Sequence, residues 1–144
     1  MNDTIVTKVH WSFWLIGIFF LTWNVSASVN FIVQMIPDIT AIMPDTHRAI
    51  IETRPIWATA GFALGAFAGA LACLLLLLRN SIAYPIFIAS LLGTMVTMIH
   101  TINIANSVIT FNSFEKVMMI VLPIVVSVFL IWYAKMSRNK NWIN

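Results

Sequence analysis

Apolar residues are gathered into four long stretches that contain no Lys, Arg, Asp or Glu. These stretches cover residues 9–37, 55–78, 80–114 and 117–134. The hydrocarbon core of a bilayer is about 30 Å thick, so a helix that rises about 1.5 Å per residue needs about 20 apolar residues to cross it. An ionised side chain at the bilayer centre would cost several kcal/mol. The pattern therefore predicts an all-α integral membrane protein, a bundle of four transmembrane helices.

Breaks in the apolar pattern set the expected boundaries. Pro37-Asp38 ends the first stretch, and Pro55 suits the first turn of the second span because its φ is fixed near the helical value. The link around Arg79-Asn80 is so short that spans two and three must form an antiparallel hairpin. We expect a single membrane domain over residues 1–144, with spans at about 11–36, 55–78, 81–103 and 114–134, an outer loop at 37–54 and a tail at 135–144.

Local signals predict further detail outside and inside these spans. In the outer loop, Asp45 is placed to cap a short surface helix over residues 46–53, with Ile50 and Ile51 facing the membrane. Asn112 precedes Glu115 by three residues, which is the spacing of a capping box at the start of span four. Pro123 lies inside that span, where its missing N–H is expected to bend the helix.

The positions of the basic residues predict the orientation. With four alternating spans, five basic residues fall on one side and three on the other, and the richer side faces the cytoplasm. Both termini are therefore expected in the cytoplasm. Trp and Tyr residues, which favour the headgroup level, gather on the same side. The basic residues of that side are Lys8, Arg79, Lys135, Arg138 and Lys140, and those opposite are Arg48, Arg54 and Lys116.

Composition excludes several functional classes. At 144 residues with 60% hydrophobic content, the chain has no room for a soluble catalytic domain beside four spans. The basic residues behind the net charge of +3 lie at membrane ends, so we expect no nucleic-acid partner. His10, His47 and His100 fall in three separate regions, and Cys73 is read as a packing residue. We expect no enzymatic activity, no catalytic residues, no metal site and no cofactor.

Span two contains glycines at four-residue spacing, Gly61, Gly65 and Gly69. Small residues at this spacing form a groove on which the backbone of another helix can approach closely. The spacing predicts helix packing at these positions. It leaves open whether the neighbour is another span of the same chain or a second subunit.

Uncharged polar residues lie at matching depths in spans one and three. Asn30 and Gln34 fall in the outer half of span one, and His100 and Asn103 in the outer half of span three. Polar side chains facing lipid lose their hydrogen bonds to water, so these should face protein or a wet cavity. One hypothesis is an outward-opening pocket for a neutral hydroxylated solute, with Arg54 and Trp57 at its rim. The other is that the four residues form interhelical hydrogen bonds that only fix helix register.

Parts of the sequence resemble a family of small bacterial inner-membrane proteins that are commonly labelled sugar transporters or left hypothetical. The resemblance is carried by Phe13-Trp14-Leu15 and Trp23-Asn24, by Arg54-Pro55-Ile56-Trp57-Ala58-Thr59-Ala60, by Gly65-Ala66-Phe67-Ala68-Gly69 and by Tyr84-Pro85-Ile86-Phe87. It implies a multi-pass protein of the bacterial inner membrane with four helices. None of these motifs carries a catalytic residue.

Two functional hypotheses follow. The first is binding or transport of a small polar, sugar-like solute through the outward-facing pocket. The alternative is a non-catalytic structural or accessory subunit that associates with other membrane helices, as the glycine groove and the short aqueous loops suggest. The expected partners are the lipid bilayer, a second copy of the chain or another membrane protein, and in the first case the solute.

Overall fold

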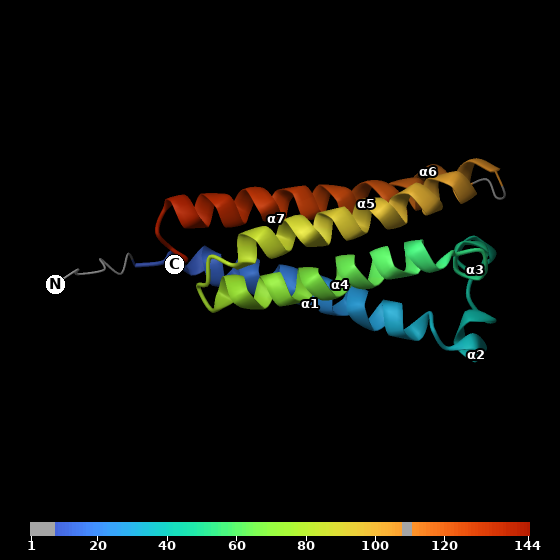
Figure 1. Ribbon diagram of the computed structural model, residues 1–144, viewed down its shortest axis with the longest axis horizontal. Helices are drawn as coiled ribbons and strands as arrows, with labels where there is room; N and C mark the ends of the chain where they lie inside the picture. The colour runs from blue at the N-terminus through green and yellow to red at the C-terminus, as the bar shows by residue number, and fades with distance from the viewer. Residues whose placement is uncertain (1–7, 108–110) are drawn as a thin grey trace.

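Four long helices lie side by side along the length of the molecule (Figure 1). The computed structural model describes residues 8–107 and 111–144, and these residues form helices and no strand. In chain order the elements are α1 (Trp11–Val33), α2 (Pro37–Thr40), α3 (Asp45–Glu52), α4 (Ile56–Leu77), α5 (Ala83–Ser107), α6 (Ser113–Lys116), the π-helix η1 (Val117–Val121) and α7 (Leu122–Asn139).

The last three elements follow one another without a break, and we call Ser113–Asn139 the fourth span. It joins α1, α4 and α5 as helices that are long and apolar enough to cross a membrane. The chain is therefore a small multi-pass membrane protein with an all-α four-helix fold. Figure 1 shows residue 144 at the same end of the bundle as the start of α1, which we call the terminal end, whereas α2, α3 and α6 lie at the other, the loop end.

The centre of the bundle is the α4–α5 hairpin that the short link predicts. A Cβ added at Gly93 of α5 would lie 2.6 Å from the Gly65 backbone nitrogen and 2.7 Å from the Gly61 carbonyl oxygen. The two backbones therefore touch at this point, and only glycine fits. Gly69, the third glycine of the groove, lies against Asn24 of α1 and Ser90 of α5. The groove is thus occupied by helices of the same chain.

At the terminal end, the residues after α7 fold back onto the α4–α5 link. Asn144 accepts a hydrogen bond from the Ser81 amide at 2.7 Å and donates one to the Arg79 carbonyl at 2.8 Å. The Arg79 side chain donates to the Trp142 carbonyl at 2.6 Å, and Ile143 is buried in the core. The segment that the sequence suggested as a tail therefore continues α7 to Asn139 and then closes this end of the bundle.

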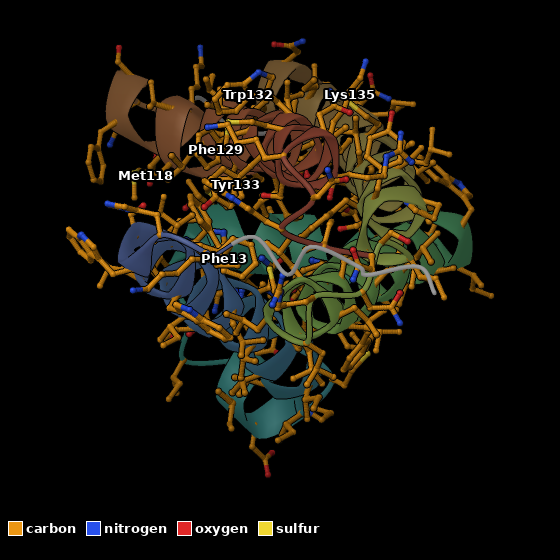
Figure 2. The ribbon with its side chains drawn as sticks, turned by 90° about the vertical axis from the view of Figure 1, so that its left-hand side faces the viewer. Phe13, Met118, Phe129, Trp132, Tyr133 and Lys135 are labelled. Carbon is orange, nitrogen blue, oxygen red and sulfur yellow. The ribbon has the colours of Figure 1, made fainter. Side chains whose placement is uncertain are left out.

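Aromatic rings join α1 to α7 in the terminal half. Phe13 stacks on Tyr133 with ring centroids 6.3 Å apart, and Phe20 contacts Phe129 at 5.3 Å. Phe129 and Tyr133 are themselves stacked at 5.9 Å. Figure 2 looks along the bundle from the terminal end and shows Phe13, Phe129 and Tyr133 between the two helices. We call the four residues Phe13, Phe20, Phe129 and Tyr133 the aromatic layer.

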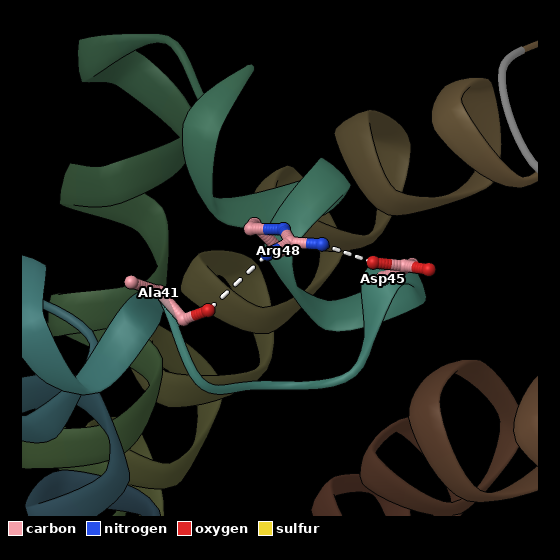
Figure 3. Close-up of polar contacts among 3 residues, drawn as sticks. All are labelled: Ala41, Asp45 and Arg48. Carbon is pink, nitrogen blue, oxygen red and sulfur yellow. Dashed lines mark hydrogen bonds and ion pairs between the residues drawn. The ribbon is translucent and has the colours of Figure 1, made fainter.

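The loop end corrects two predictions about α3. Asp45 is the first residue of α3 rather than its cap, and its carboxylate pairs with Arg48. Arg48 also donates to the Ala41 carbonyl at 3.2 Å, which ties α3 to the end of α2 (Figure 3). Ile50 does not face the membrane, because it is buried against α5 and Phe111. The sequence pattern showed an apolar face on this helix but could not show what covers it.

Two predictions for the fourth span concern its start and Pro123. The capping box is confirmed, since the backbone N–H of Glu115 donates to the Asn112 side-chain oxygen at 2.8 Å and the Glu115 carboxylate accepts from the backbone N–H of Asn112 at 3.1 Å. Before Pro123, the Leu122 amide donates to the carbonyl of Val117, five residues back, in place of the usual four. The helix thus accommodates the missing proline N–H by a local π-turn.

Candidate binding cavity

A cavity of about 590 Å³ lies between α1 and the fourth span, above the aromatic layer. The ring contacts between α1 and α7 end at Phe20 and Phe129, and the cavity lining begins about one turn further on, at Trp23 and Val126. The hairpin of α4 and α5 contributes Gly65 and other lining residues from behind. The volume is within the range of about 300–1,000 Å³ that is typical of small-molecule sites.

Hydroxyl groups of α5 line the wall that faces α1. Ser90, Thr94, Thr97 and Thr101 are spaced so that they share one face of the helix. Two of them cross to α4, since Ser90 donates to the Gly65 carbonyl at 2.6 Å and Thr97 to the Ala58 carbonyl at 3.1 Å. Their protons are therefore used within the protein, while their oxygens keep lone pairs that a ligand donor could reach.

Asn24 lies at the deep end of the cavity, and its side chain is buried. Its amide donates to the Phe20 carbonyl at 2.8 Å and contacts the sulfur of Cys73 at 3.5 Å. Cys73 is thus a buried packing partner of α1, as its apolar surroundings suggested. The Asn24 side chain also fills the space beside Gly69. These contacts fix α1 against α4 at the depth where the cavity ends.

At the loop end, Arg54 and Gln34 form one polar pair of the lining. Arg54 Nη2 donates to the Gln34 side-chain oxygen at 2.7 Å, and the guanidinium carbon lies 5.1 Å from the centre of the Phe62 ring. Arg54 Nε and Nη1 are buried and have no hydrogen-bond partner. Burial lowers the pKa of Arg54, yet a guanidinium stays protonated at neutral pH. A partly unpaired positive charge therefore lines the cavity.

Glu115 also lines the loop end of the cavity and is held in place by two neighbours. One carboxylate oxygen accepts from the Thr46 hydroxyl at 3.3 Å, and the other accepts from the Asn112 amide. The first contact joins α3 to α6 across the loop end. The only ion pair among the described residues is Arg48 with Asp45, so neither Glu115 nor another carboxylate neutralises Arg54.

The structure brings together three of the six residues suggested for the pocket and separates the others. Asn30, Gln34 and Arg54 line the cavity, whereas His100, Asn103 and Trp57 do not. His100 is buried outside this lining, where Trp57 of α4 lies edge-on to its ring at 6.2 Å. His100 Nε2 lies 3.3 Å from the Ile50 carbonyl, which can only accept, so this nitrogen carries the proton. Asn103 is exposed.

The hydroxyl residues of α5 were not part of the predicted pocket, although their spacing in the sequence indicates a shared face. The four hydroxyl residues of α5 recur at steps of four, three and four, which places them on one helix face. On α1, by comparison, steps of three and four residues in the sequence already place Trp23 and Asn30 on one face, and both line the cavity. By contrast, the contributions of Met118 and Met119 depend on the π-turn before Pro123, and hydropathy alone does not show them.

Metal binding has no geometric support in the part of the chain that the structure describes, because no three His, Cys, Asp or Glu side chains gather there. Comparison of the chain with models of protein families, with curated proteins and with solved structures finds no match. Functional inference therefore rests on the residues of the cavity.

Proposed function

We propose that this membrane protein binds a small solute with polar groups in the cavity between α1 and the fourth span. The observation that supports this is the combination of a volume of about 590 Å³ between the helices with amide and hydroxyl groups on its walls. Interhelical hydrogen bonds alone would need no such space. A few fixed polar groups in a mostly apolar cavity are the usual arrangement of a small-molecule site.

The proposed location is the bacterial inner membrane, with both termini in the cytoplasm. Lys8 precedes the start of α1, Arg79 is bonded to Trp142 near the chain end, and Lys135 is seen from the terminal end in Figure 2. All three belong to the terminal end of the bundle, where the positive-inside rule favours the cytoplasm. In this orientation, the lining residues of the loop end, Arg54 among them, lie toward the outside of the cell. The solute would then be captured from the outer side of the membrane.

Transport would need a further step, because the aromatic layer closes the cavity toward the terminal end. Phe20 and Phe129 contact each other directly below the lining residues of the deep end. A solute could pass only if α1 and α7 separated at this layer. Binding is therefore the part of the proposal that the geometry supports, and movement of a sugar-like solute across the membrane remains the prediction made from the sequence.

Filling the cavity with a tryptophan at Ala27 is expected to abolish solute binding. Ala27 lines the cavity from α1, and an indole ring there would occupy space that a ligand needs. Val29→Trp is the matched control, since Val29 is 52% exposed on the same helix and does not line the cavity. The measurement is the unfolding temperature in detergent with a panel of neutral sugars and small organic acids.

At least one of these probes should stabilise the wild type and Val29→Trp, but not Ala27→Trp. A probe that stabilises all three proteins equally binds elsewhere. The proposal would be contradicted if no probe in the panel distinguished the two tryptophan variants.

One observation favours the alternative of an accessory subunit. In the most apolar stretch of each span, only 17% of the residues are buried in α1 and in the fourth span, against 39% in α4 and in α5. These two helices therefore offer the largest free surface to lipid or to a partner helix, which includes a second copy of the chain. The glycine groove does not add to this alternative, because α5 and α1 already occupy it.

A further inference from the structure

Arg54 is placed at the cavity without an acidic partner. Its guanidinium has one protein acceptor, the Gln34 side chain, and lies over the Phe62 ring. Nε and Nη1 are enclosed and have no acceptor. Buried donors of a charged group cost more when unpaired than neutral ones, so such an arrangement is unfavourable unless an anion can approach.

Other titratable groups of the lining do not remove this positive potential. Glu115 is the acidic residue of the lining, and both of its oxygens already accept hydrogen bonds from Thr46 and Asn112. His47 lies at the same end and brings no negative charge. A ligand with one acidic group would therefore find a cation that no protein carboxylate has paired.

The walls around this cation are largely apolar. Methionine, aromatic and other apolar side chains on several elements make most of the cavity surface apolar, although polar residues also belong to the lining. Methionine is flexible and polarisable, which suits a hydrocarbon body without a fixed shape. The apolar residues concerned are Trp23, Phe62, Met98, Met118, Met119 and Val126.

The cavity also has an edge toward the lipid. Ser26 and Asn30 of α1 and Met118 of the fourth span line the cavity and are exposed on the outside of the bundle. These residues belong to helices that can cross a membrane. Because the opening between them is flanked by two spans, a molecule dissolved in the bilayer can enter sideways.

We infer that the cavity takes up an acidic amphiphile from the lipid, with its carboxylate or phosphate group at Arg54 and its hydrocarbon body against the methionines. The inference rests on the proposed function and narrows its ligand to a class. Carboxylate and phosphate groups bind a guanidinium through short, charge-assisted hydrogen bonds. The Phe62 ring lies over the guanidinium, so a head group would reach the enclosed nitrogens only after this ring had turned aside.

Quenching of Trp23 fluorescence by brominated lipids tests the inference. The protein is placed in nanodiscs of phosphatidylcholine and titrated, at an alkaline pH where the acid is ionised, with dibrominated stearate or with the matching neutral alcohol. Trp23 is the reporter because it lines the cavity. Its contribution is obtained by subtracting the fluorescence of the corresponding Trp23→Phe protein, which retains the other tryptophans. Arg54→Gln removes the cation, and Arg54→Lys keeps a positive charge.

Arg48→Gln is the matched control. It removes one positive charge from the same end of the bundle, at a residue that does not line the cavity. The concentration of stearate at half-quenching should rise about tenfold or more in Arg54→Gln, in keeping with the strength of hydrogen bonds to charged groups. It should stay within about twofold of wild type in Arg48→Gln, and Arg54→Lys should recover much of the loss.

The alcohol should bind more weakly than stearate and should not distinguish the Arg54 variants. Equal quenching by stearate in wild type and Arg54→Gln would overturn the acidic class and leave binding in the cavity standing. Displacement of stearate by millimolar inorganic phosphate would overturn the lipid source, because the head group would then suffice. Absence of Trp23 quenching by both lipids would overturn the inference, while the Ala27→Trp experiment would still decide the proposed function.

Discussion

Replacement of Phe13 by alanine is expected to lower the free energy of unfolding by about 2–4 kcal/mol. Phe13 is fully buried, and its ring contacts Tyr133 and Trp142 at centroid distances of 6.3 and 6.0 Å. In a soluble protein this substitution would cost about 3–5 kcal/mol, part of which is transfer from water. In a bilayer that part shrinks, because lipid is as apolar as the core, and the lost packing remains.

The measurement is the unfolding midpoint of the purified protein in mild detergent. Phe19→Ala provides the control, since Phe19 is on the same helix and is 61% exposed. Its loss should shift the midpoint little. If the two variants unfolded at the same temperature, the aromatic layer would not hold α1 against α7.

Gly93→Ala is expected to destabilise the α4–α5 hairpin by about 1–3 kcal/mol. The added methyl group would lie 2.6 Å from the Gly65 nitrogen and 2.7 Å from the Gly61 carbonyl. Both atoms belong to the backbone, so no side-chain rotation can relieve the clash. The two helices must therefore move apart along the whole contact, which should also weaken the hydrogen bond from Ser90 to Gly65.

Gly17→Ala is the control for the Gly93 substitution. It adds the same methyl group at a position where no backbone of another helix is in contact. A Cβ at Gly17 meets only the side chain of Leu77, which can rotate away. Thermal unfolding in detergent should therefore show a clear loss for Gly93→Ala and little change for Gly17→Ala. Equal loss in both would mean that close backbone approach does not govern the hairpin.

The spans and the hairpin could be predicted from the sequence because hydropathy and loop length are local properties. The capping box at Asn112 and Glu115 was readable for the same reason, since its residues are three positions apart. The apolar face of α3 was also visible in the sequence. Hydropathy does not distinguish lipid from protein as its cover, and Ile50 proved to face α5.

The candidate pocket could be predicted only in part. The sequence indicates the depth of each residue in the membrane but not the side of the bundle on which it lies. Asn30 and His100 lie in matching halves of two parallel spans, but α1 packs on α4 and not closely on α5. The His100 ring therefore meets Trp57 of α4 and not the polar residues of α1. The position around the bundle depends on which helices are neighbours, and short links alone do not determine this for α1 and the fourth span.

Cysteine accessibility tests most directly whether a cavity opens at the loop end and is closed at the terminal end. With Cys73 replaced by alanine, single cysteines are introduced at Thr94 in the cavity, at exposed Asn112 and at Ser137, which is fully buried in the terminal half. Intact cells are then treated with a membrane-impermeant thiol reagent. We expect labelling of Thr94→Cys and Asn112→Cys and none of Ser137→Cys. An unreactive Thr94→Cys beside a reactive Asn112→Cys would contradict an opening of the cavity at the loop end, and an Asn112→Cys that reacts only in inverted vesicles would reverse the orientation.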